Sequence, residues 1–164
     1  MLDYSGKLTL WKNKHVQLST VTEHKSGEVG KQQHLIDEQF AAHPLARLWI
    51  NHPGDLKPWS ERRPSKLAGN FSLPRVAQHK NLGFAIYDLT RLPDVLPFVQ
   101  FFAAKDAFDL IEPVENWLFV RCGSGCAGIW CSELTEPETT GPYKTAVRRA
   151  QGPRLGWTVT LGTA

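Results

Sequence analysis

The chain has 164 residues, of which 41% are hydrophobic and 21% charged, and its formal net charge is +3. This composition is typical of a folded globular chain and the length suits one core, so we expect a single domain over residues 1–164. The basic residues are scattered and no apolar run approaches the ~20 residues of a membrane-spanning helix, which argues against a nucleic-acid partner and against a membrane partner.

The amino terminus shows no visible secretion signal. Met1 to Gly6 lacks both the basic cluster and the apolar core of a signal peptide, so the chain as it stands is predicted to be cytoplasmic. The cysteines, Cys122, Cys126 and Cys131, are odd in number and lack a paired CxxC spacing. We therefore expect free thiols, and neither a disulfide framework nor a structural zinc site.

Prolines and glycines divide the chain into short segments that alternate in polarity or are rich in β-branched and aromatic residues, which is typical of strands. In chain order the predicted strands are Lys7 to Trp11, His15 to Val21, Gln32 to Phe40, Leu45 to Asn51, Asn81 to Leu89, Pro97 to Ala103, two strands within Trp117 to Cys131, Tyr143 to Arg149, and Gly156 to Gly162. Two stretches, Asp37 to Ala42 and Arg75 to Lys80, would also fit a short helix. Such a succession is typical of a sandwich or barrel, and we predict an all-β fold, an antiparallel β-sandwich of roughly nine or ten strands.

Two connecting segments carry predictions of their own. From Asp55 to Lys80, charged residues and prolines occur without clean periodicity, which predicts one long irregular excursion of the kind that is often functional. Gly123-Ser124-Gly125 predicts a hairpin loop. A three-residue loop at this point would place Cys122 opposite Cys126 on the two strands.

The densest group of reactive side chains is His34, His52, Asn70 and Arg75. If the strands beside the two histidines form a hairpin, His34 and His52 lie at the same end of that hairpin. An imidazole can transfer a proton near neutral pH, so we predict His34 and His52 as catalytic residues. Asn70 and Arg75 are predicted to bind substrate through a sugar hydroxyl or a carboxylate. The alternative is that these side chains cap turns or pack on the core.

The tryptophans divide by their place in the sequence. Trp49, Trp117 and Trp157 lie in predicted strands and are expected to be packed. Trp59 stands in the charged excursion, where an exposed indole would stack on a pyranose ring. Trp59 and nearby Arg63 are therefore predicted to bind substrate.

A metal site is not expected. Zinc held by His34 and His52 would lack an obvious third ligand, with Asp37 and Asp55 the nearby candidates. We predict no metal and no cofactor.

Several short motifs, taken in order, resemble one family. They are Gly30-Lys31-Gln32-Gln33-His34, Asn51-His52-Pro53-Gly54, Arg63-Pro64-Ser65, Ala68-Gly69-Asn70, Leu73-Pro74-Arg75-Val76-Ala77-Gln78 and Gly141-Pro142-Tyr143. Together they are similar to the carboxy-terminal β-sandwich of heparinase II/III-like polysaccharide lyases and of related large bacterial carbohydrate-active proteins.

The resemblance implies an amino-terminal α/α toroid that packs against the sandwich, with polysaccharide in the cleft between them. It also implies β-elimination next to a uronic acid, with a Tyr or His as the base. The predicted strands of this chain leave no segment for such a toroid. Lys66-Leu67 and Phe71 depart from the family pattern, in which an aromatic residue precedes the Ala-Gly-Asn motif and a glycine follows it, so the ligand of this loop would differ.

Two functions follow as expectations. The first is a carbohydrate-processing or polysaccharide-binding domain, in the enzymatic case a lyase-like protein without its toroid, whose partner is an acidic polysaccharide or oligosaccharide. The second is a non-catalytic binding or assembly module that pairs with a toroid-domain partner or forms a homo-oligomer. Such a module would expose an apolar patch for its partner.

Overall fold

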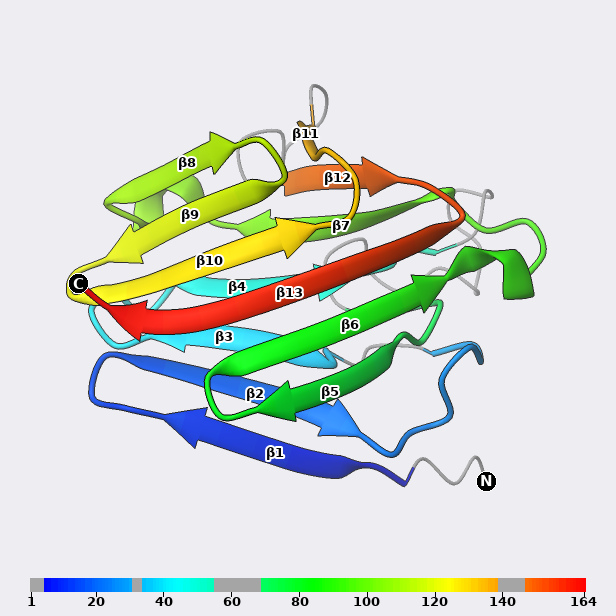
Figure 1. Ribbon diagram of the computed structural model, residues 1–164, viewed down its shortest axis with the longest axis horizontal. Coiled ribbons are helices and arrows are strands. Elements are labelled where there is room, and N and C mark those ends of the chain that lie inside the picture. The colour runs from blue at the N-terminus through cyan, green and yellow to red at the C-terminus, as the bar shows by residue number, and fades with distance from the viewer. Residues whose placement is uncertain (1–4, 31–33, 55–68, 139–146) are drawn as a thin grey trace.

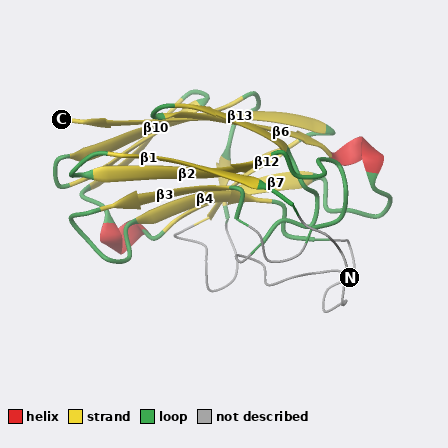
Figure 2. Ribbon diagram, turned by 90° about the horizontal axis from the view of Figure 1, so that it is seen from below, coloured by secondary structure: helices red, strands yellow, loops and turns green. Residues whose placement is uncertain are grey.

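Two antiparallel sheets lie face to face in the computed structural model, which describes residues 5–30, 34–54, 69–138 and 147–164. Figure 2 shows the two layers edge-on, with β10 and β13 above β3 and β4. The predicted antiparallel β-sandwich is confirmed. Within the described residues the helical elements are two 3₁₀ turns, η1 (Leu89–Arg91) and η2 (Lys105–Ala107), and neither has the length or the apolar character to cross a membrane.

Both sheets draw strands from distant parts of the chain (Figure 1). The seven-stranded sheet has the order β1 (Lys7–Lys12), β2 (Val16–Thr22), β3 (Ile36–Phe40), β4 (Arg47–Asn51), β7 (Phe98–Ala103), β12 (Val147–Gln151) and β11 (Glu136–Pro137). The six-stranded sheet has the order β5 (Arg75–His79), β6 (Leu82–Asp88), β13 (Arg154–Thr163), β10 (Gly125–Cys131), β9 (Trp117–Cys122) and β8 (Leu110–Val114).

The described residues form thirteen strands, more than the nine or ten predicted. β5 arises from a stretch that also fitted a helix, because pairing with β6 overrides its weak local preference. Asp37 to Ala42, the other such stretch, mostly belongs to β3. β8 contains Pro113 and β11 ends at Pro137, so neither resembled a regular strand, yet both lie at sheet edges where proline is tolerated.

The hairpin between β9 and β10 corrects the predicted register. Cys122 pairs with Gly125 and Cys126 pairs with Arg121, so the loop holds two residues, Gly123 and Ser124, rather than three. Gly123 has a φ of 58°, a conformation that two-residue hairpin turns favour and that glycine adopts without strain. Cys122 therefore points into the core and Cys126 to the outer face. Cys122, Cys126 and Cys131 are all free in the structure.

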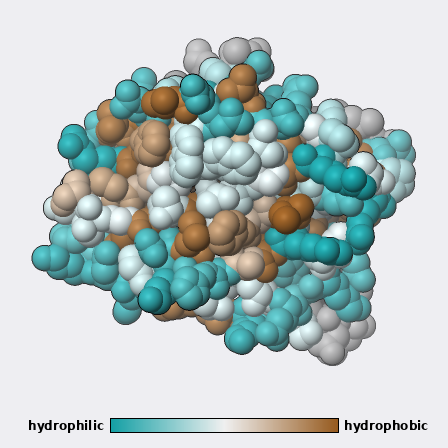
Figure 3. All heavy atoms as spheres, in the orientation of Figure 1, coloured by the Kyte–Doolittle hydropathy of each residue, from teal (hydrophilic) through white to brown (hydrophobic). Residues whose placement is uncertain are grey.

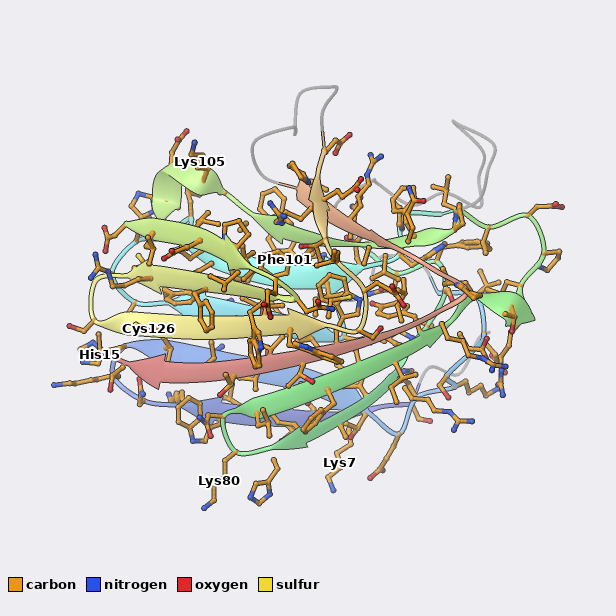
Figure 4. The ribbon with its side chains drawn as sticks, turned by 45° about the horizontal axis from the view of Figure 1, so that its top comes forward. Lys7, His15, Lys80, Phe101, Lys105 and Cys126 are labelled. Atoms are coloured by element: carbon orange, nitrogen blue, oxygen red, sulfur yellow. The ribbon has the colours of Figure 1, made fainter. Side chains whose placement is uncertain are left out.

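The core fills the space between the two inner faces with aliphatic and aromatic side chains. Strand alternation sends Leu18, Leu48 and Phe101 inward from the seven-stranded sheet. Trp157 of β13 packs against Phe101 across the core (Phe101 is labelled in Figure 4). The centroids of the two rings are 6.5 Å apart and the ring planes are inclined by 19°. Trp157 is 2% exposed, which confirms the expectation that it is packed.

Glu38 is the exception among the inward-facing residues. It lies in β3 between Ile36 and Phe40, both members of the core, and pairs in register with Leu18 and Leu48. Its exposure is 0%, and neither carboxyl oxygen has a hydrogen-bond partner among the described residues. Burial, and then the neighbouring charge of Asp37, raise the pKa of Glu38 well above its ordinary value, so the folded protein favours the protonated form of this carboxyl.

This buried carboxyl predicts a pH-dependent stability. Because the folded state holds the proton more tightly than the unfolded state, the full contribution to stability is present below about pH 4.5 and is lost as the pH rises toward the raised folded pKa. The slope is about 1.4 kcal/mol per pH unit within that window. Glu38→Gln keeps the shape and removes the titration, so its stability relative to wild type increases with pH. Urea unfolding from about pH 4 to pH 8 measures this difference. Parallel curves for the two proteins would show that Glu38 does not titrate in this way.

Candidate functional site

Two of the predicted site residues, His52 and Asn70, lie in direct contact inside the protein. The backbone amide of His52 donates to Oδ1 of Asn70 at 2.9 Å, and both residues are 0% exposed. Nε2 of His52 lies 2.9 Å from the carbonyl oxygen of Leu96. Both residues were predicted to act on a substrate, and in the structure both are buried.

A network of buried polar groups extends from this pair. The hydroxyl of Tyr87, on β6 of the opposite sheet, donates to Oδ1 of Asn70 at 2.6 Å. Asn51 donates to the carbonyl of Gly69 at 2.7 Å, and Gln100 donates to Oδ1 of Asn51 at 3.1 Å. Burial raises the pKa of Tyr87 well above its ordinary value, so its hydroxyl remains a donor.

His34 lies on the outer face of the seven-stranded sheet. Its ring stacks on Trp49 with centroids 4.9 Å apart, and Trp49 stacks in turn on Phe102 at 4.1 Å. Nδ1 of His34 is 3.8 Å from Oδ2 of Asp37, which also binds Arg47. β3 and β4 do form the hairpin that the sequence predicted. His34 contacts Trp49 and Asp37, whereas His52 contacts Asn70 and the carbonyl of Leu96. The described contacts of the two histidines therefore share no residue.

The remaining predicted residues lie elsewhere. Arg75 is exposed on β5, in the other sheet, and is not part of the buried network. Trp59 and Arg63 fall within residues 55–68 and so lie outside the described residues. The structure therefore joins His52 with Asn70 and separates both from His34 and Arg75.

The six-stranded sheet presents a different kind of surface to solvent. Many of its outward positions carry rings, glycines and threonines. We call this surface the aromatic face, and define it by Phe84, Trp117, Phe119, Gly128, Trp130, Thr158 and Thr160. Strand register sets Trp117, Trp130, Thr158 and Phe84 in one row across β9, β10, β13 and β6.

The rings of the aromatic face lie low on the sheet. Trp117 and Phe119 are parallel, with an interplanar angle of 9° and centroids 5.7 Å apart. A β-carbon at Gly128 would lie 3.3 Å from Trp117 and 3.5 Å from Phe119, so both rings rest against this glycine. Phe119 remains 41% exposed and Phe84 38% exposed. Figure 3 shows pale and brown residues across the middle of this face, with hydrophilic residues mostly around its rim.

A basic hollow adjoins the aromatic face where β5, β6 and β13 run side by side. We call it the arginine pocket and define it by Arg75, Arg91, Arg154 and Asp88. Its volume is about 260 Å³, and Ser26, Gly27, Leu73 and Ile86 complete the lining. The hydrogen bond from Thr90 is the main cause that lowers the pKa of Asp88, with smaller contributions from Arg154 and Arg91, so this carboxylate is charged at neutral pH.

Sequence reasoning missed most of this surface. Trp117 was expected to be packed, but it is only half-buried and faces outward. The signal was present in β9, where Trp117, Phe119 and Arg121 alternate with the buried Leu118 and Val120. Arg91 and Arg154 had no such signal: β5 was not predicted as a strand, so its pairing with β6, which leads to Arg91, was not foreseen, and Arg154 is brought in by the distant strand β13.

Comparison of the chain with protein-family models, with curated proteins and with solved structures found no match.

The buried network predicts unequal losses of stability. Asn70→Ala removes the acceptor of two hydrogen bonds, and we expect the free energy of unfolding to fall by about 2–3 kcal/mol. Tyr87→Phe removes one donor and keeps the ring, for a loss of about 1 kcal/mol. Gln39→Ala, on the exposed part of β3, is the control and should stay within about 0.5 kcal/mol of wild type. Chemical denaturation measures all three; an Asn70→Ala protein as stable as the control would contradict the role given to the network.

Proposed function

We propose that this protein is a non-catalytic polysaccharide-binding module whose ligand lies on the aromatic face. The observation that carries the proposal is the row of exposed and half-exposed rings set over glycines and threonines on the outer side of the six-stranded sheet. The fold does not require rings at solvent-facing positions of a strand, so the row of rings on this face supports a binding role.

The chemistry of these side chains suits a sugar chain. A pyranose ring has apolar C–H faces and a polar rim of hydroxyls. The flat faces of Trp117, Trp130 and Phe84 offer apolar contact to the C–H faces, while the indole N–H groups and the hydroxyls of Thr158 and Thr160 offer hydrogen bonds. Gly128 lets the rings of Trp117 and Phe119 lie close to the sheet, because a β-carbon at this position would contact both of them.

The catalytic alternative has less support from the described residues. A general acid or base must reach the reacting proton within hydrogen-bonding distance, directly or through one water. His52 is fully buried, and one ring nitrogen faces the carbonyl of Leu96. His34 reaches solvent, but its described neighbours are Trp49, Asp37 and the ion pair that Asp37 makes with Arg47. We therefore propose binding rather than lyase chemistry. The kinship with polysaccharide lyases, and the acidic polysaccharide or oligosaccharide as partner, remain proposals that come from the sequence.

Truncating the rings of the aromatic face tests the proposal. In a glycan-array or calorimetric screen that includes both uronic-acid and neutral polysaccharides, we expect wild type to bind at least one. Trp130→Ala and Trp117→Ala should each weaken that binding by about tenfold, because truncation of a buried contact aromatic costs about 1–2 kcal/mol.

Trp49→Ala supplies the matched control, since Trp49 is a half-exposed tryptophan on the outer face of the other sheet. This variant should bind as wild type does. Loss of binding in Trp49→Ala with retention in Trp130→Ala would move the ligand to the opposite face. The absence of binding to any polysaccharide in the screen would overturn the proposal.

A second candidate function is assembly with another subunit. Five of the large exposed hydrophobic residues lie on the outer face of the six-stranded sheet, namely Phe84, Ile86, Leu110, Val114 and Phe119. Contiguous exposed apolar surface of this kind also marks protein interfaces. A toroid-domain partner or a second copy of this chain would cover the same face.

Light scattering over a concentration series separates the two candidates. A monomer at all concentrations favours the glycan-binding proposal, whereas a dimer that Val114→Lys dissociates favours assembly through this face. Leu10→Lys is the control: Leu10 is 51% exposed on β1, comparable with the 46% of Val114, but lies on the other sheet. A dimer that both variants dissociate would place the interface elsewhere.

A further inference from the structure

We infer that the arginine pocket binds the anionic substituent, a carboxylate or a sulfate group, of a glycan whose sugar rings lie on the aromatic face. This inference rests on the proposed function and adds to it the charge of the ligand and the residues that recognise it. The pocket lies outside the buried network of His52 and Asn70 and has no part in it.

Strand pairing brings the charged groups of the pocket together. Arg75 of β5 pairs in register with Ile86 of β6, and Arg154 of β13 pairs with Asp88 of β6. Arg91 comes from η1, which begins directly after Asp88. Three guanidinium groups therefore approach one hollow, two from the opposite ends of the β5–β6–η1 segment and one from the distant strand β13.

The charges of the pocket do not balance. Three arginines face one carboxylate, which leaves a net charge of +2 in the lining. Asp88 accepts the contacts of two of them, with Oδ2 3.4 Å from Nε of Arg91 and Oδ1 3.6 Å from Nε of Arg154. Arg75 has no ion pair with any described residue. A planar guanidinium without a partner is the group that best fits a carboxylate or a sulfate.

The position of Arg91 depends on the turn below it. Gly27 has a φ of 79°, and a β-carbon at this residue would lie 2.9 Å from Nη1 of Arg91 and 3.0 Å from its Cδ. Because glycine has no β-carbon, the Arg91 side chain can lie directly against the backbone of Gly27. The amide of Gly27 donates to the carbonyl of Leu73 at 2.7 Å, which fixes the turn against the segment that leads into β5.

The pocket is continuous with the aromatic face. A β-carbon at Gly156 would lie 4.0 Å from the Trp130 ring, so this ring extends beside Gly156 on β13. Gly156 pairs with Ile86, and Ile86 both lines the pocket and pairs with Arg75. From β10 to β5 there are three strand spacings, or roughly 14 Å. One oligosaccharide can therefore contact Trp130 and place an acidic group beside Arg75.

The test compares an acidic oligosaccharide with its neutral methyl ester, and adds a second acidic oligosaccharide whose anionic group is a sulfate. Isothermal titration uses three probes of similar length: oligogalacturonate, the same oligomer with its carboxyl groups methyl-esterified, and a sulfated galactan oligosaccharide. We expect wild type to bind oligogalacturonate or the sulfated oligosaccharide about tenfold more tightly than the neutral ester, because a charge-assisted hydrogen bond contributes on that order. The acidic probe that binds identifies the source of the anionic group.

Arginine variants then locate the preference. Arg75→Gln should lower the affinity for the acidic probe about tenfold and leave the affinity for the ester unchanged. Arg121→Gln is the matched control, because it removes the same charge from the same sheet but lies opposite Cys126, away from the pocket. Its affinity for the acidic probe should remain that of wild type. Thermal unfolding confirms that each variant is folded.

Two results would overturn the inference. Equal affinity of wild type for the ester and for both acidic probes removes the anionic recognition and leaves the proposed glycan-binding function standing. An equal loss in Arg75→Gln and Arg121→Gln assigns the preference to general surface charge rather than to the pocket. Failure of all three probes to bind, together with a failed polysaccharide screen, would remove the proposed function itself.

Discussion

The side-chain carbonyl of Asn70 is the point at which both sheets and the segment between them are joined. It accepts hydrogen bonds from the backbone amide of His52, at the end of β4, and from the hydroxyl of Tyr87, on β6 of the opposite sheet. A buried polar group without a partner costs more than an ordinary hydrogen bond gains, so these three groups constrain one another. The relative position of the two sheets at this end of the sandwich follows from that constraint.

The same constraint fixes the backbone around it. The amide of Phe71 donates to the carbonyl of His52 at 3.0 Å, and the amide of Gly30 donates to the carbonyl of Phe71 at 2.8 Å. A β-carbon at Gly30 would lie 2.2 Å from the carbonyl oxygen of Asn70, so only glycine fits there. Backbone hydrogen bonds thus join the segment around Asn70 and Phe71 to two other segments, one at His52 and one at Gly30. The segment then continues into β5, which carries Arg75. The buried network thus constrains the start of the segment that leads to Arg75, one of the four residues that define the arginine pocket.

The sequence predicted the fold well because alternation of polarity is a local property. β2, β6 and β13 all show that alternation, and each was found close to its predicted position. The edge strands β5, β8 and β11 were missed because their own residues carry little of the pattern and pairing supplies their stability. The hairpin register was missed by one residue, since two-residue and three-residue loops fit Gly123-Ser124-Gly125 equally well before the strands are paired.

The candidate site was less predictable for a different reason. His52 and Asn70 are polar residues in an irregular part of the sequence, and the same description fits both a ligand-binding pair and a buried structural pair. Only burial separates the two cases, and burial depends on Tyr87, which belongs to a strand of the other sheet. Arg75 was singled out, but its neighbours in the pocket come from β13 and η1 and could not be assigned to it from the sequence.

The two sheets use their outer faces in different ways, although the same alternation produces both. On the seven-stranded sheet, Asp37 and Arg47 form an ion pair beside the stacked rings of His34 and Trp49, so these groups already satisfy one another. On the six-stranded sheet the rings lie over glycines and threonines, and three arginines and one aspartate line a pocket whose charges do not balance. A surface that is internally compensated has little to gain from a ligand, whereas exposed rings beside an uncompensated guanidinium gain contacts on binding. This difference, rather than the identity of any one residue, is the physical reason to place the ligand on the six-stranded sheet.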